Sequence, residues 1–400
     1  MTDDSPIRTA RLRQIPPSVW ALGLVSLLMD FSSEMIHALL PVYLVGAMGA
    51  TMAEVGVIEG VAEATASVVK IFSGAVSDWF ASRKLLAILG YGLAAATKPM
   101  FPLAPDVAWV MAARFIDRVG KGIRGAPRDA LVADVTPPEL RGAAFGLRQS
   151  LDTVGAFLGP AVAVVAMWLT VDDIRTVFWV ATIPAVLAVI VLAAGVSEPE
   201  NTRPARPARF PLHWEELKRL GGRFWLVVAV ATLFGLARFS EAFLILKAAT
   251  VGLPDALAPL VLVVMNVVYA GASYPAGSFS DRGDRISPLA VGIFMLLLAD
   301  VALAQAQSLP LVWVGVVLWG LHMGLTQGLF AALVADAAPG ALRGTAFGVF
   351  NLAGGLALLI ASLAAGKLWD VYGPGATFAA GGVLAALSLA ALLTLAIARR

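Results

Sequence analysis

Long apolar runs recur along the whole chain and are separated by short polar or charged segments. Each run is about 20 residues or longer, which is enough for a helix to cross roughly 30 Å of hydrocarbon. The strands of a membrane barrel would alternate apolar and polar residues, and these runs do not. A membrane span must satisfy its own backbone, so the alternative is a helix. The pattern therefore predicts an all-α integral membrane protein with twelve transmembrane helices, over 18–48, 55–79, 84–104, 107–133, 141–170, 174–196, 223–249, 255–279, 287–306, 310–336, 342–366 and 374–398.

Basic residues are distributed unequally between the two sides of these spans. With the N-terminus placed in the cytoplasm, the inside segments hold seventeen Lys and Arg residues and the outside segments hold three. Cytoplasmic loops carry the excess of Lys and Arg in membrane proteins. The sequence thus predicts a multi-pass protein of the cell (inner) membrane with both termini in the cytoplasm.

Composition agrees with this picture and removes several classes of function. Hydrophobic residues make up 59% of the 400 residues and charged residues 14%, whereas about 25% of a soluble domain is charged. The absence of cysteine excludes disulfides, thiolate metal sites and Cys nucleophiles. The N-terminus lacks the features of a cleaved secretory signal. The net charge of +2 gives no reason to expect a nucleic-acid partner.

The chain repeats itself. "ALVADVTPPELRGAAFG" at 130–146 returns as "ALVADAAPGALRGTAFG" at 332–348, displaced by 202 residues, and "GAVSD" at 74–78 matches "GSFSD" at 277–281. Between the copies, 197–222 is Pro- and Arg-rich and then amphipathic, as in a short surface helix. We expect an N-terminal six-helix bundle over 1–196, a cytoplasmic linker over 197–222 and a C-terminal six-helix bundle over 223–400. Two such repeats are typical of transporters that work by alternating access.

Together with the repeat, several motifs resemble the major facilitator superfamily over essentially the whole chain. Its loop signature G-x-x-x-D-R-x-G-R-K between spans 2 and 3 is matched loosely, with Trp79 and Ala81 in place of Arg and Gly, and more closely in the second half. In the family this loop bonds the two halves in one conformation, so the resemblance implies a gate. The matching residues are Gly74, Asp78, Arg83, Lys84, Asp281, Arg282 and Arg285.

Spans 4 and 5 extend the resemblance. "RFIDRVG" is similar to the family's R-x-x-Q-G-x-G, and Arg114 takes the position associated with proton coupling, while Asp117 and Arg118 replace Gln and Gly. "GAFLGP" contains Gly155, Gly159 and Pro160, the core of a motif of proton-driven exporters, and we expect these three residues to take part in gating. The resemblance implies an exporter, although such glycines also serve plain helix packing.

The stretch "DFSSEMIH" places Asp30, Glu34 and His37 on one helical face inside span 1. Asp30 is about 18 Å from the cytoplasmic end at 1.5 Å per residue. A charge at the bilayer centre costs about 2.5–3.5 kcal/mol even on the lenient insertion scale, so these groups must face the bundle interior or a hydrated cavity. We predict proton coupling by Asp30, Glu34, Arg114 and Asp117.

Other polar groups inside the spans are candidates for contact with the substrate. The first half is rich in charge, whereas the second offers Arg238 and Glu241 in span 7, Asp300 in span 9 and mostly neutral polar groups. The predicted substrate-binding set is Glu34, His37, Glu63, Lys70, Arg118, Asp152, Arg238, Glu241, Asn266, His322, Gln327 and Asn351. The alternative is structural: Arg118, Lys121, Arg124, Arg128, Asp129 and Arg148 would form salt bridges that hold the spans in register.

The leading hypothesis is a proton-coupled secondary active transporter that exports a small charged or amphiphilic solute. It would use no cofactor other than the proton gradient; its partners would be a small-molecule substrate, protons and membrane lipid, and it would be monomeric. One alternative is a carrier of a divalent metal or metal chelate that uses Asp30, Glu34 and His37. Another is a transporter-like receptor or a channel. An enzyme is not expected, because the sequence contains no H-E-x-x-H, G-x-S-x-G or P-loop.

Overall fold

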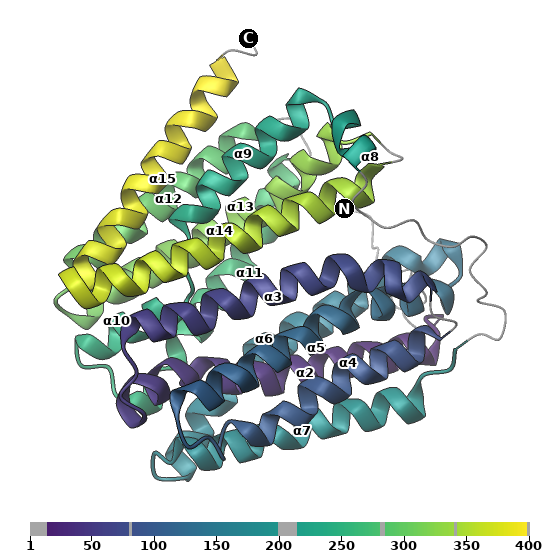
Figure 1. Cartoon of the computed structure of the whole chain (residues 1–400), viewed down its shortest axis with the longest axis horizontal. Coiled ribbons are helices and arrows are strands. Elements are labelled where there is room, and N and C mark those ends of the chain that lie inside the picture. The colour runs from purple at the N-terminus through teal and green to yellow at the C-terminus, as the bar shows by residue number, and fades with distance from the viewer. Residues whose placement is uncertain (1–13, 80–81, 199–213, 281–284, 340–341, 398–400) are drawn as a thin grey trace, which may run out of the picture. The chain divides into compact units, whose positions relative to one another are not determined.

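The computed structural model describes residues 14–79, 82–198, 214–280, 285–339 and 342–397. In these ranges the regular structure is entirely helical, and Figure 1 shows long helices joined by short connections. The helices and their attached turns are α2 (Pro17–Val42), η1 (Tyr43–Ala47), α3 (Met52–Trp79), α4 (Arg83–Thr97), η2 (Lys98–Met100), α5 (Val107–Asp134), η3 (Pro138–Leu140), α6 (Arg141–Leu169), α7 (Ile174–Gly195), α8 (Trp214–Arg219), α9 (Gly222–Ala237), α10 (Ala242–Thr250), η4 (Asp255–Leu257), α11 (Leu260–Ser280), α12 (Ile286–Gln305), α13 (Leu309–Ala337), α14 (Arg343–Tyr372) and α15 (Pro374–Ile397).

Local signals in the sequence explain where several helices begin and end. Ser82, Asp106 and Asp173 precede α4, α5 and α7, and each side chain accepts a hydrogen bond from a backbone N–H of the first turn. Short polar residues at this position satisfy donors that the helix itself leaves free. Gly373 follows α14 with a φ of 84°, a left-handed conformation that glycine adopts without steric cost.

Helices occupy all twelve predicted spans, and the agreement with membrane dimensions is strongest for nine of them. Among the described residues, nine helices are long and apolar enough to cross a membrane. The spans outside this set are α3, α4 and α5. α4 is 15 residues long, and α3 and α5 carry many of the charged side chains discussed above. The all-α membrane fold is confirmed.

One expectation was wrong: span 7 is not a continuous helix. α9 ends at Ala237 and α10 begins at Ala242, with an irregular turn between them. The Ser240 backbone N–H donates to Ser362 Oγ at 3.2 Å, and Ser240 Oγ accepts from the N–H of Ala242 at 3.2 Å. Side chains therefore supply hydrogen bonds that a continuous helix would make through its backbone. Apolar periodicity cannot reveal such a break, because the break depends on Ser362, a residue far along the chain.

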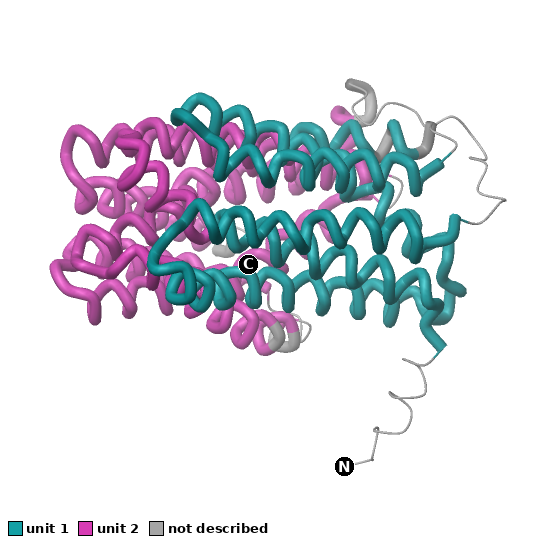
Figure 2. The backbone as a smooth tube through the Cα atoms, turned by 90° about the horizontal axis from the view of Figure 1, so that it is seen from below, with its two compact units in different colours: residues 1–37, 68–210 teal, residues 38–67, 211–400 magenta. Residues whose placement is uncertain are grey.

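By their internal contacts the residues form two compact units, coloured separately in Figure 2. Unit 1 contains residues 1–37 and 68–210, and unit 2 contains residues 38–67 and 211–400. Residues 38–67, from the end of span 1 and the start of span 2, thus pack with the second half of the chain. The predicted division into bundles over 1–196 and 223–400 stays a prediction. In the predicted linker 197–222, α8 is a short helix, and 199–213 lie outside the described residues.

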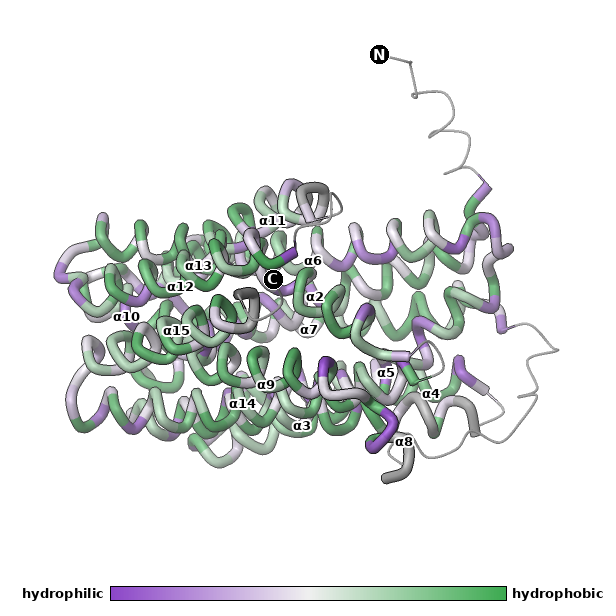
Figure 3. The backbone as a smooth tube through the Cα atoms, turned by 90° about the horizontal axis from the view of Figure 1, so that it is seen from above, coloured by the Kyte–Doolittle hydropathy of each residue, from purple (hydrophilic) through white to green (hydrophobic). Residues whose placement is uncertain are grey.

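The helices place small residues inward and large apolar residues outward. On α7, Ala181, Ala185 and Ala188 are fully buried, whereas Ile183 is 60% exposed and Ile190 is 54% exposed. Small inward residues let membrane helices approach closely, and exposed apolar faces of this size suit contact with lipid. Figure 3 shows hydrophobic positions along the helices, with many hydrophilic positions at helix ends and turns.

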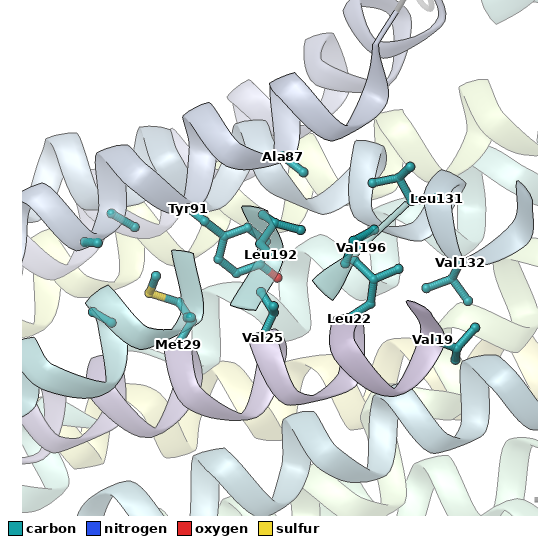
Figure 4. Close-up of a cluster of buried hydrophobic side chains, with 14 of the residues drawn as sticks. Val19, Leu22, Val25, Met29, Ala87, Tyr91, Leu131, Val132, Leu192 and Val196 are labelled. Atoms are coloured by element: carbon teal, nitrogen blue, oxygen red, sulfur yellow. The ribbon is translucent and has the colours of Figure 1, made fainter. Parts of the chain in front are cut away.

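The core of unit 1 is an apolar cluster to which five helices contribute, α2, α4, α5, α6 and α7. Figure 4 shows side chains of α2, α4, α5 and α7 meeting around Tyr91, with Leu22 and Met29 of α2 and Leu192 of α7 among them. Lipid is as apolar as these side chains, so the cluster gains stability mainly from van der Waals packing. Ser26 and Tyr91 lie on this interface with their hydroxyl oxygens 3.5 Å apart. This packing holds α2 against α4 and α5, and most of the polar residues described next lie on α2 and α5.

Candidate functional site

The polar face of α2 divides between two partners. Glu34 and His37, one turn apart, bring Oε2 within 3.3 Å of Nδ1, whereas Asp30 Oδ1 lies 3.3 Å from Arg124 Nη2 of α5. The side chains of Asp30 and Glu34 are 24% and 22% exposed, and that of Arg124 is 6% exposed. The two carboxylates therefore lie at the edge of the packed interior. Each carboxylate is paired with a cationic or ionisable group, but neither is fully shielded from solvent.

The proposed metal ligands do not gather into a site. Among the described residues, no three His, Asp or Glu side chains lie close enough together to hold a metal ion. Asp30 is engaged with Arg124, so Glu34 and His37 offer a single adjacent pair. The geometry thus gives no support to a metal site formed by Asp30, Glu34 and His37.

A buried ion pair that our sequence analysis missed lies between α5 and the end of α4. Lys98 Nζ donates to Asp117 Oδ1 at 2.8 Å and to Ser33 Oγ of α2 at 3.0 Å. Both charged side chains are at most 5% exposed. Arg118 Nε lies 3.9 Å from the other oxygen of Asp117, and Arg114, one turn earlier in α5, is nearly completely buried. The sequence does mark Lys98 as a candidate, because it is a lysine inside an apolar run.

Arginines of α5 and α6 form a further network with two carboxylates. Arg128 lies 3.0 Å from Asp129 and 3.8 Å from Asp152, and Arg148 lies 3.9 Å from Asp129 and 3.7 Å from Asp152. Asp152, a predicted substrate ligand, is thus shared by two guanidinium groups. These contacts join α5 to α6, which agrees with the structural interpretation of the same arginines.

The glycines of "GAFLGP" bring α6 directly onto α2. A Cβ added at Gly155 would overlap the carbonyl oxygen of Leu27, and one added at Gly159 would lie 2.7 Å from the carbonyl oxygen of Phe31 and 2.9 Å from Cβ of Glu34. Pro160 is buried beside them in α6. The motif therefore lets α6 pack closely against the turn that carries Glu34. A gating role for these residues stays a prediction.

The two loops predicted to gate the protein have equivalent Arg–Asp ion pairs. Arg83, at the start of α4, contacts Asp134 at the end of α5, and Arg285 contacts Asp336 at the end of α13. The two pairs are displaced by the same 202 residues as the sequence repeat, and each lies within its own unit. Lys84 Nζ donates to the carbonyl of Ala193 at 2.8 Å.

The structure describes little of the remaining predicted gate residues. Asp281 and Arg282 lie outside the described residues, as does the side chain of Asp78. Gly74 is within α3. A role for any of them in gating stays a prediction.

In unit 2, polar side chains form a chain at the break in span 7. Arg238 Nη2 donates to Glu241 Oε1 at 2.9 Å. With the Gln327 amide oriented so that its oxygen faces Arg238, that oxygen accepts from both guanidinium nitrogens at 3.1 Å, and the amide nitrogen donates to Tyr269 Oη at 3.2 Å. Three predicted residues are thus brought together across the break and α13. Tyr269 of α11 is a member that the sequence analysis missed.

A second polar contact lies at the same break. Ser240 Oγ is 3.5 Å from Oε2 of Glu59, a residue of α3 that is 2% exposed. Glu63, further along α3 in unit 2, is half-buried, whereas Lys70 is exposed and belongs to unit 1. A role for Glu63 and Lys70 in substrate binding stays a prediction. They differ in burial and pack in different units.

The neutral polar candidates of the second half are scattered. His322 of α13 is completely buried, with Phe234 and Trp319 ring centroids 6.1 Å and 5.2 Å away. Asn266 and Asn351 are half-buried. Aromatic surroundings indicate that His322 belongs to the packed interior of unit 2.

Comparison with known proteins places this arrangement in a family. The profile of the Major Facilitator Superfamily matches residues 22–362. An uncharacterised MFS-type transporter of Methanocaldococcus jannaschii is 31% identical over 386 residues, which cover 94% of this chain and 94% of that protein. The multidrug resistance protein MdtH of Yersinia pestis is 28% identical over 172 residues, 42% of this chain and 40% of that protein. The crystal structure of the nucleoside transporter NupG superposes with a TM-score of 0.79 at 13% identity, covering 95% of this chain and 99% of that one, and shows a shared fold.

Proposed function

The chain belongs to the major facilitator superfamily, and we propose that it is a proton-coupled secondary transporter that exports a small charged or amphiphilic solute by alternating access. Family membership makes it a multi-pass membrane transporter and not an enzyme. The proposal adds the driving ion, the direction and the class of substrate. The observation that carries it is the pair of α2 carboxylates, which are partnered yet partly accessible.

The α2 carboxylates suit proton exchange because two opposing effects act on them. A nearby cation favours the ionised carboxylate, and removal from water favours the neutral acid. Asp30 has Arg124 at 3.3 Å, and Glu34 has the His37 ring at 3.3 Å. A movement that separates either pair would turn the carboxylate from a paired anion into a group that must bind a proton. Alternation between the two arrangements would load and release the proton.

The Lys98–Asp117 pair has a different role in this proposal. Both side chains are almost completely buried, and Lys98 Nζ lies 2.8 Å from Asp117 Oδ1. Proton exchange between this pair and water would therefore require breaking a buried salt bridge. We assign it to holding the end of α4 against α5 and, through Ser33, against α2. Arg114 and Asp117 would then position the proton site and would not themselves carry the proton.

The substrate contact of the second half is proposed at the Arg238–Gln327–Tyr269 chain. Arg238 is 24% exposed in its side chain, so it can offer guanidinium N–H groups to a solute. A planar guanidinium suits carboxylate or phosphate groups. The excess of arginine in α5 points to the same class, an anionic or zwitterionic small molecule.

Direction and topology have independent support. The "GAFLGP" motif resembles proton-driven exporters, and one relative is named a multidrug resistance protein. The excess of Lys and Arg on one side supports cytoplasmic termini in the cell (inner) membrane. Export then means movement from the cytoplasmic side outward.

The proposal is tested with purified protein in proteoliposomes under an imposed pH gradient. A panel of anionic, zwitterionic and amphiphilic solutes is screened with and without the gradient. Asp30→Asn and Glu34→Gln are expected to abolish the dependence on the gradient while solute exchange without a gradient continues. Glu139→Gln, which neutralises an exposed carboxylate of η3, is the matched control and should behave like the wild type.

Gradient-driven transport that survives in both α2 variants would refute the proton site. Solute flux that never saturates would instead identify a channel. Accumulation only in the direction opposite to export would refute the assigned direction while leaving the coupling intact.

A further inference from the structure

Asp300 of α12 is an acidic residue isolated in the interior of unit 2. Its side chain is completely buried. Neither carboxylate oxygen has a hydrogen-bond partner among the described residues. A buried carboxylate with neither donor nor cation is strongly unfavourable as an anion, and α12 contains no other charged residue. The function proposed above does not use this residue.

Two glycines of α15 and the break in span 7 form the wall around Asp300. A Cβ added at Gly381 would lie 2.9 Å from Asp300 Oδ2 and 3.1 Å from Phe239 Cε1. A Cβ added at Gly382 would lie 3.4 Å from Asp300 Cβ and 3.5 Å from Leu297 Cδ1. The carboxyl group thus occupies space that these glycines leave free, next to the Phe239 ring.

No neighbouring element supplies an evident counter-charge. α15 contains no titratable residue among its described positions, α13 contributes His322 and Asp336, and α11 contributes Tyr269. Arg238, next to Phe239 in sequence, is already engaged by Glu241 and Gln327. A divalent metal ion would need several oxygen ligands, and no group of three His, Asp or Glu residues that could hold one is found among the described residues. The proton is the cation that needs no further ligand.

We propose that Asp300 is a second proton-binding site, held as the neutral acid in the α12–α15 interface and opened to water by movement of the Phe239 turn. The turn lies where span 7 is broken, so it can move without unwinding a continuous helix. When Phe239 withdraws, water reaches the carboxyl group and the proton leaves; when it returns, only the neutral acid fits. The site is separate from the carboxylates of α2, because Asp300 lies in unit 2.

Infrared difference spectroscopy of the full-length protein in lipid nanodiscs tests this without any solute. The C=O stretch of a protonated carboxyl group is recorded in neutral and alkaline buffers and after transfer from H₂O to D₂O. We expect a band in neutral buffer that moves in D₂O, weakens in alkaline buffer and is absent from Asp300→Asn. The amide closely matches the neutral acid in size, so elution and thermal midpoint should match the wild type. Glu139→Gln should leave the band unchanged.

Asp300→Glu keeps a carboxyl group and should shift the band, so the assignment does not depend on the amide variant alone. Phe239→Leu should make the response to D₂O faster, because it weakens the wall. A missing Asp300 band in neutral buffer would overturn the proposal, since the group would then be ionised. A band that changes neither in D₂O nor in alkaline buffer would also overturn the proposal, because Asp300 would then be an acid that never exchanges its proton with water. Neither result bears on Asp30 and Glu34, so the two proposals fail separately.

Discussion

Replacing Lys98 by Met removes one charge from the buried pair and leaves the other behind. The side chains have similar length, so the packing changes little while Asp117 loses its nearest cation. The Nζ–Oδ1 distance is 2.8 Å, for which Coulomb's law at an effective dielectric constant of ~20 gives about 6 kcal/mol. Arg118 remains 3.9 Å from Asp117, and at the same dielectric constant that attraction is about 4 kcal/mol.

Arg118 therefore limits the damage of this substitution. Removing one partner of a buried pair usually costs about 3–5 kcal/mol, and we expect Lys98→Met near the lower end, about 3 kcal/mol. Asp117→Asn should cost more, because among the contacts the structure describes Lys98 would keep only neutral acceptors, the introduced amide oxygen and the Ser33 hydroxyl, and no anion. The double variant should cost less than the sum of the single variants, since it leaves neither charge unpaired.

The assay is unfolding of the purified protein in mixed micelles by titration with sodium dodecyl sulfate, followed by tryptophan fluorescence. The four proteins of the cycle give the interaction energy, which we expect at about 2 kcal/mol or more. Wild-type stability for both single variants, or effects that add to within about 0.5 kcal/mol, would refute a buried and coupled pair.

Three further substitutions, two of them with a matched control variant, test local features. Gly155→Ala should sharply reduce the yield of monodisperse protein by size-exclusion chromatography, because its Cβ would overlap the Leu27 carbonyl, whereas Gly146→Ala, which meets no atom within 4 Å, should not. Asp173→Ala should lower the thermal midpoint at neutral pH by removing a cap worth about 1 kcal/mol. The hydrogen bond from Thr176 holds the pKa of Asp173 below its ordinary value. The stabilisation by the ionised cap is therefore fully present above the ordinary pKa and is lost as the pH falls through the lowered pKa of the folded protein. The difference in thermal midpoint between Asp173→Ala and the wild type should accordingly shrink in acid. Ser362→Ala should destabilise by about 1–3 kcal/mol, since it strips the partner from the buried Ser240 N–H; Ser388→Ala, whose hydroxyl bonds within its own helix, should cost less.

Features set by neighbouring residues were predictable from the chain. The apolar runs located the spans because a helix needs a fixed length to cross a membrane. The i, i+3 pair Glu34–His37 was also predictable, because helical spacing brings such residues together. The Arg238–Glu241 contact forms instead within the irregular turn between α9 and α10. The resemblance to the major facilitator superfamily, carried by the repeat and the motifs, was confirmed by the profile match.

Features set by distant residues could not be predicted in this way. Which cation meets which carboxylate depends on how helices rotate against one another, and periodicity leaves that rotation open. In the structure Asp30 pairs with Arg124 and Asp117 pairs with Lys98. The spacing within span 1 had suggested instead that Asp30, Glu34 and His37 could act together as ligands. The break at Ser240 depends on Ser362, more than one hundred residues later.

Hydrophobicity along the chain therefore determined the fold class, the spans and the presence of charged groups inside them, because the cost of placing a charge in hydrocarbon depends on the residue type and its depth. The tertiary structure alone decided which of those charges are paired, half-open or isolated, as Asp117, Glu34 and Asp300 respectively are. The reason is physical: the state of a buried charge is set by atoms within a few ångströms of it, and those atoms come from helices that the sequence order does not make neighbours.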